Sequence, residues 1–124
     1  MKVINTSKAP KAIGPYSQAI EANGLVITSG QLPIDPATGE FAPGGIKEQT
    51  RQSLTNAKAI LEAAGTGLNK VVKTTVFLAD MNDSAAMNEV YAEFFEAPFP
   101  ARSAIAVKTL PKNALVEVEC VAEK

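Results

Sequence analysis

The stretch from Leu115 to Ala122 constrains the fold more than any other part of this sequence. Apolar side chains stand at every second position, and Glu117 and Glu119 lie between them. Successive side chains of a strand point to opposite faces of a sheet, so this period of two predicts a strand with one buried face. The buried set is expected to be Val116, Val118, Cys120 and Ala122. The chain therefore needs a sheet and a layer that covers one side of it.

A hairpin is predicted near the start of the chain. Residues 15–22 read as extended chain that becomes a strand, residues 25–31 read as its partner, and Asn23-Gly24 lies between them. Asn-Gly is a strong hairpin signal because both residues accept positive φ. Gly30, inside the second run, suggests a bulge or a group that approaches the backbone closely.

Two amphipathic helices are predicted to supply the covering layer. The first spans residues 46–64, with an apolar stripe and a polar face that includes Gln49 and Asn56. The second begins near residues 82–84 and ends near residue 96, and its stripe includes Met87 and Tyr91. Residues 2–5, residues 71–78 and the run led by Arg102 add strands. The order β-β-β-α-β-α-β-β predicts one α+β domain over residues 1–124, a mixed sheet with two helices on one face.

The other face of that sheet is expected to carry apolar residues as well as Glu117 and Glu119. Its expected apolar residues are Leu25, Ile27, Val71, Phe77, Leu115 and Val121. An apolar open face favours burial between subunits, and we expect a closed cyclic oligomer.

Composition excludes several kinds of chemistry. There is no histidine and one cysteine, Cys120, so histidine catalysis, an internal disulfide and cysteine-based zinc sites are excluded. The aspartates show no ligand spacing, and no metal is expected. Net charge is −1 with no block of like charges, which counts against nucleic acid as a partner. No apolar segment is long enough to cross a bilayer, so no membrane association and a cytoplasmic location are expected.

Two charged residues stand out as candidates for chemistry. Arg102 follows Pro98 and Pro100, which stiffen its approach, and it could clamp a carboxylate or phosphate. From this stretch alone a surface salt bridge is the simpler explanation, because arginines are mostly exposed. Glu117 lies mid-strand among apolar neighbours, where desolvation would raise its pKa toward that of a useful acid or base. The alternative is an exposed glutamate, or one paired with a lysine across an interface.

Uncharged candidates are fewer. Tyr16 could donate its hydroxyl to a ligand, or it could pack with its tip exposed. Ser29 places a hydroxyl beside Gly30, although a local hydrogen bond would also explain it. Cys120 is expected to be an inert apolar residue.

Four separated motifs, in this order, together resemble the Rid/YjgF family of reactive intermediate (enamine/imine) deaminases, also called L-PSP endoribonuclease-like. They are Gly14-Pro15-Tyr16-Ser17-Gln18-Ala19, Thr28-Ser29-Gly30-Gln31-Leu32-Pro33, Pro100-Ala101-Arg102-Ser103 and Glu117-Val118-Glu119. The resemblance covers essentially the whole chain.

The resemblance implies a chorismate-mutase-like fold and a homotrimer with sites between subunits. It implies hydrolysis of 2-imino acids, such as 2-iminobutanoate and 2-iminopropanoate, to 2-oxo acids and ammonia, without a cofactor. Arg102 would grip the substrate carboxylate and Glu117 would hold or activate water. Tyr16 and Ser29 would line the pocket, Gly30 would allow close approach, and Asn88 matches a further polar position.

One departure from the family concerns Ala104, where many relatives have cysteine. We expect the backbone of Ala104 to position the substrate instead. Two other functions remain open at this point. The first is an RNA-cleaving translation inhibitor, which the charge and the lack of histidine disfavour. The second is a non-catalytic trimer that binds small metabolites and would not need Glu117.

Overall fold

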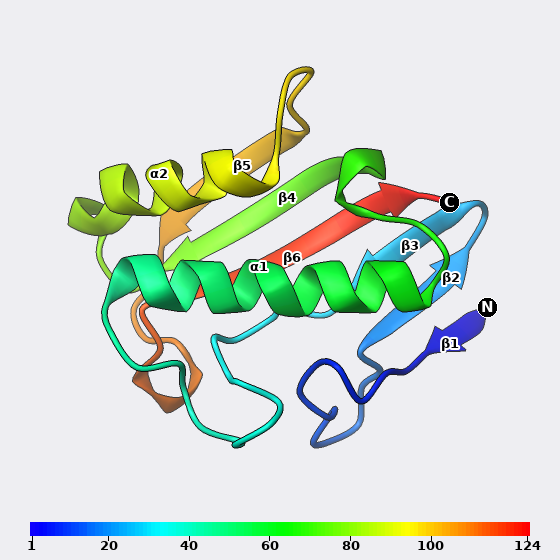
Figure 1. Ribbon diagram of the computed structural model, residues 1–124, viewed down its shortest axis with the longest axis horizontal. Coiled ribbons are helices and arrows are strands. Elements are labelled where there is room, and N and C mark those ends of the chain that lie inside the picture. The colour runs from blue at the N-terminus through cyan, green and yellow to red at the C-terminus, as the bar shows by residue number, and fades with distance from the viewer.

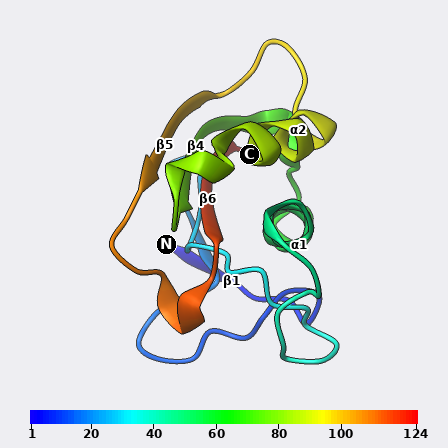
Figure 2. The ribbon, with the colours of Figure 1, turned by 90° about the vertical axis from the view of Figure 1, so that its left-hand side faces the viewer.

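A computed structural model describes all residues 1–124 as a sheet covered on one face by two helices. The helices are α1 (Ile46–Ala63) and α2 (Ser84–Phe94), and both lie in front of the sheet in Figure 1. Figure 2 shows the two layers from the side, with both helices on the same side of the strands. The strands are β1 (Lys2–Ile4), β2 (Ala19–Ala22), β3 (Leu25–Thr28), β4 (Val71–Leu78), β5 (Ala101–Ala106) and β6 (Val116–Glu123). The predicted α+β class and element order are confirmed.

The alternating strand lies inside the sheet. The order is β1-β2-β3-β6-β4-β5, so β6 has neighbours on both sides. All pairs are antiparallel except β4 and β5, which are parallel and joined through α2. The four apolar residues predicted to be buried in this strand are fully buried against the helices: Val116, Val118, Cys120 and Ala122.

The predicted hairpin is present, but its second strand is shorter than expected. Asn23 and Gly24 have φ values of 53° and 75°, as a tight turn between β2 and β3 requires. β3 ends at Thr28, whose hydroxyl accepts a hydrogen bond of 3.0 Å from the Cys120 backbone N–H. Pairing with β6 resumes at Gln31, opposite Val118. The segment between, which includes Gly30, leaves the ladder.

The polar face predicted for the first helix is partly wrong. Gln49 and Asn56 are buried rather than exposed, because both bind backbone groups of loops packed against α1. The side-chain oxygen of Gln49 accepts from the Leu115 N–H at 2.9 Å. Asn56 Nδ2 donates to the carbonyls of Leu32 and Ile34 at 3.1 and 2.8 Å. These side chains replace backbone partners that the loops lack.

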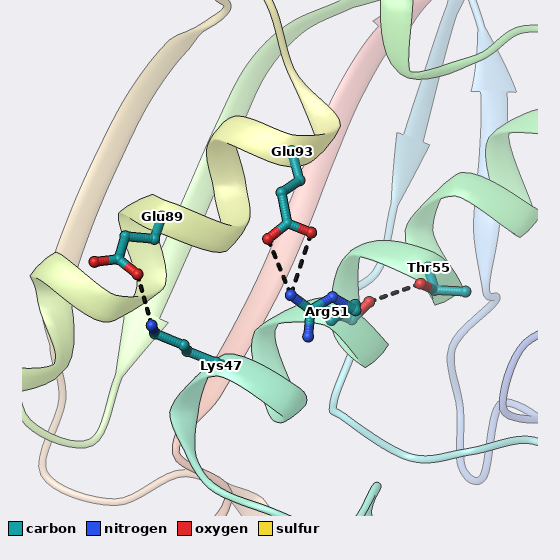
Figure 3. Close-up of polar contacts among 5 residues, drawn as sticks. All are labelled: Lys47, Arg51, Thr55, Glu89 and Glu93. Carbon is teal, nitrogen blue, oxygen red and sulfur yellow. Dashed lines mark hydrogen bonds and ion pairs between the residues drawn. The ribbon is translucent and has the colours of Figure 1, made fainter.

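The helices are joined at their exposed edges by two ion pairs, drawn in Figure 3. Lys47 Nζ lies 2.6 Å from Glu89, and Arg51 Nη2 lies 2.9 Å from Glu93. Each pair links one helix to the other, one turn apart along α1. Both pairs are exposed to solvent.

The open face of the sheet carries the apolar residues predicted for it, with one exception, and they lie among polar residues that include Glu117, Glu119 and Lys73. Ile27 and Ile105 are 40% and 49% exposed, and four further residues are half-buried: Leu25, Phe77, Leu115 and Val121. Val71, expected on this face, lies instead in the core. A bulge between Val71 and Lys73 shifts the register with β6 and places Val71 opposite buried Ala122.

Neither helix combines the length and the apolar character that a membrane-spanning helix needs.

Candidate functional site

Glu117 projects from the open face of β6 and lies against the backbone at Gly30. A Cβ atom at position 30 would lie 2.8 Å from Cδ of Glu117 and closer still to Oε2. Only glycine therefore leaves room for this carboxylate, which explains the close approach that the sequence suggested. Gly30 and Glu117 therefore belong together, and the unit that they form is the first part of the candidate site.

The carboxylate of Glu117 is half-buried and has no cationic partner. No lysine pairs with it inside the chain, and the alternative of a lysine across an interface stays a prediction. Burial raises the pKa of Glu117, and the nearby charge of Glu119 raises it further. A carboxyl group with a raised pKa exchanges protons more readily near neutral pH than an ordinary glutamate does.

Ser29 and Tyr16 lie close to this unit. The Ser29 hydroxyl donates to the Ser17 carbonyl at 2.6 Å, so the local hydrogen bond considered for it is present. The Tyr16 hydroxyl accepts from the Ile13 N–H at 3.3 Å, which leaves its own proton free to donate. Tyr16 and Gly30 line a cavity of about 510 Å³. Tyr16 and Ser29 line a second hollow of about 390 Å³.

Arg102 lies on the other face of the sheet. It pairs in β5 with Thr74 of β4, which is buried beneath α2. Its guanidinium carbon lies 4.7 Å from the ring centroid of Tyr91, and Nη1 lies 4.0 Å from the sulfur of Met87. It belongs to no salt bridge, so the surface-salt-bridge alternative is wrong within this chain.

The remaining predicted residues accompany Arg102. Ala104 is two residues further along β5 and packs against the core. Asn88 is exposed on α2, next to Met87 and three residues before Tyr91. Tyr91 and Met87 were identified from the sequence only as part of a helix stripe. Their four-residue spacing on α2 was the signal that both would face one neighbour.

One chain thus holds its candidate residues in two groups. Tyr16, Ser29, Gly30 and Glu117 gather at the open face, whereas Arg102, Asn88 and Ala104 lie on the helix side or at the β5 edge. The sequence also missed Lys11 and Lys112, which line the larger cavity. No three Cys, Asp or Glu side chains converge as metal ligands would.

Fold and site together define a small two-layer α+β protein with a desolvated glutamate and an unpaired arginine. Residues 6–124 match the family model described as Endoribonuclease L-PSP. This chain belongs to that family, the Rid/YjgF family that its motifs resemble.

Named relatives match almost the whole chain. A RutC family protein of Pyrococcus horikoshii is 60% identical over 99% of this chain and 98% of its own. The 2-iminobutanoate/2-iminopropanoate deaminase of Capra hircus is 51% identical over 98% of this chain and 88% of its own. The crystal structure of E. coli TdcF with bound serine has a TM-score of 0.95 and 46% identity, and covers 100% of this chain and 99% of that one.

Proposed function

We propose that this protein is a 2-iminobutanoate/2-iminopropanoate deaminase that hydrolyses 2-imino acids to 2-oxo acids and ammonia. The observation that carries the proposal is the desolvated carboxyl group of Glu117, held against Gly30 without a cationic partner. The goat relative bears the name of this activity, which supports the same assignment.

The reaction needs an anion clamp, a placed water molecule and a path for protons. Arg102 binds the substrate carboxylate through its in-plane N–H groups, and Glu117 holds the water that attacks C2. The new C–O bond forms as the C=N double bond becomes single, and the proton that the water loses passes by way of Glu117 to the nitrogen. The C2 hydroxyl then loses its proton, the nitrogen takes up a second proton, and the C–N bond breaks to release ammonia and the 2-oxo acid. Tyr16 and Ser29 line the pocket beside Gly30, while Asn88 and the backbone of Ala104 contact the substrate.

We also propose that the chain works as a homotrimer with its sites between subunits. The two groups of candidate residues lie on different sides of one sheet, and the open face leaves apolar side chains such as Ile27 and Ile105 exposed. Contact between copies covers that face and creates a boundary at which both groups can meet one small molecule.

The deaminase proposal is tested with 2-iminobutanoate generated by an amino-acid oxidase and trapped with semicarbazide. The wild-type protein should suppress semicarbazone formation. Arg102→Ala should abolish the suppression because the clamp is lost, and Glu117→Ala should weaken it strongly. Arg51→Ala is the matched control, since Arg51 is an exposed arginine paired with Glu93 away from both groups. A wild-type protein that suppresses nothing would refute the deaminase.

The family description supports a second candidate, RNA cleavage. The same preparation should be incubated with end-labelled RNA. If RNA cleavage persists in both Glu117→Ala and Arg102→Ala, neither group of candidate residues carries out that cleavage. Cleavage that both variants lose, without any imine hydrolysis by the wild type, would replace the deaminase proposal.

A further inference from the structure

The surroundings of Arg102 contain an aromatic support in place of an acidic partner. The guanidinium carbon lies 4.7 Å from the centroid of the Tyr91 ring, and no carboxylate pairs with it. A cation held over a ring keeps its charge and its in-plane donors available to a ligand, whereas an acidic partner would occupy both. The support therefore orients Arg102 and, apart from the long contact of Nη1 with the sulfur of Met87, leaves its N–H groups available.

The supporting ring is itself fixed on two sides. The hydroxyl groups of Tyr91 and Thr74 share a hydrogen bond of 2.8 Å. The ring of Phe95 stacks on Tyr91 with centroids 4.5 Å apart. Tyr91 is only 6% exposed, and burial raises the pKa of its phenol, which keeps the ring neutral beneath the cation.

Thr74 connects the support back to the arginine. It is the residue that pairs with Arg102 in the parallel ladder between β4 and β5. The backbone that anchors the arginine and the hydroxyl that anchors the ring thus belong to directly paired residues. Each of the three residues therefore contacts the other two. Arg102 pairs with Thr74 in the ladder, Thr74 shares a hydrogen bond with Tyr91, and the Tyr91 ring lies against the guanidinium of Arg102.

We propose that Tyr91, fixed by Thr74, is a positioning residue that presents the edge of Arg102 to a planar carboxylate. The proposal rests on the assignment of Arg102 as the substrate clamp. The ring covers one face of the guanidinium, so an anion approaches in the plane of the N–H groups, where a carboxylate forms two parallel hydrogen bonds. The site therefore selects a carboxylate over a neutral amide of the same shape.

The test compares binding of 2-oxobutanoate and of 2-oxobutanamide by calorimetry. Tyr91→Leu should raise Kd for 2-oxobutanoate about tenfold, and Tyr91→Phe, which keeps the ring, only about two- to threefold. Kd for the amide, which lacks the charge, should change less than about twofold in either variant. Val90→Ala is the control, because Val90 is buried on the same helix and its truncation matches the loss of packing.

If Tyr91→Leu does not fold, a second variant tests the same support of Arg102. Thr74→Val preserves shape and backbone pairing but removes the hydroxyl, and it should raise Kd for 2-oxobutanoate in the same direction. Equal Kd values for wild type, Tyr91→Leu and Thr74→Val would overturn the positioning proposal and leave the deaminase intact. If the wild-type protein hydrolyses no imine but its binding of 2-oxobutanoate still depends on Tyr91, the deaminase proposal is overturned and the positioning proposal stands. Parallel losses for oxobutanoate and amide would show that Tyr91 is merely structural and would also overturn the positioning.

Discussion

At the scale of single residues, the contact between Gly30 and Glu117 gives the sharpest prediction. Gly30→Ala adds one methyl group that would lie 2.8 Å from Cδ of Glu117, so the carboxylate must move. Displacement of a catalytic group by about 1 Å costs roughly a hundredfold, and we expect kcat/KM for 2-iminobutanoate to fall by at least tenfold. Gly45→Ala is the control, because nothing lies within 4 Å of a Cβ there. Full activity in Gly30→Ala would refute the placement of Glu117.

The raised pKa of Glu117 gives a prediction about stability and pH. Folding raises this pKa above its usual value of 4.5, so the folded protein binds the proton more tightly than the unfolded chain. This contribution to stability is fully present below the usual pKa and is lost as pH rises through the folded pKa. Glu117→Gln should remove that loss, so its melting temperature should rise relative to wild type as pH increases above the usual pKa of 4.5. Glu62→Gln, an exposed change on α1, should show no such trend.

The sequence could name the candidate residues but not their neighbours. Arg102 and Glu117 were found from their own context, namely two preceding prolines and an apolar strand. The ring under Arg102 could not be found that way, because the parallel pairing of β4 with β5 brings Thr74 and Tyr91 to it from distant positions. Pairwise geometry of this kind depends on register, which sequence pattern alone leaves open.

At the scale of elements, the burial of α1 should matter far more than its ion pairs with α2. Leu61 is fully buried between helix and sheet, and Leu61→Ala should lower the free energy of unfolding by about 2–5 kcal/mol. Arg51→Ala removes the exposed pair with Glu93, and its effect on the urea midpoint should be much smaller and should vanish in high salt. Urea titrations at low and high salt check both. A salt-resistant loss in Arg51→Ala similar to that of Leu61→Ala would contradict this ranking.

Element types and order followed from periodicity, whereas local irregularities did not. The run from Val71 to Leu78 was predicted as a strand, but the bulge that turns Val71 into the core has no signature among so many β-branched residues. Asn56 looked like a solvent-facing residue until the loop at Leu32 and Ile34 supplied its acceptors. Both departures arise from contacts with distant segments.

At the scale of the whole molecule, the open sheet face predicts how the proposed trimer can be broken. Ile105 lies on that face, 49% exposed in one chain. Ile105→Lys places a charge where copies would meet, and it should yield monomers because desolvating an unpaired ammonium is costly. Sedimentation should give three times the 13.0 kDa chain mass for wild type and a single chain mass for the variant. Met81→Lys, at a residue 46% exposed outside the strands, should remain trimeric. A monomeric wild-type protein would refute the assembly.

The contact between Gly30 and Glu117 also restricts the order in which these two positions can change. An alanine at position 30 collides with the glutamate, but it becomes harmless once position 117 has been shortened. Loss of the acid can therefore precede gain of the methyl group, whereas the reverse order passes through a crowded intermediate. A chain that loses the acid first avoids this crowding, and one that already carries the methyl group can regain the acid only with its carboxylate displaced from the position seen here.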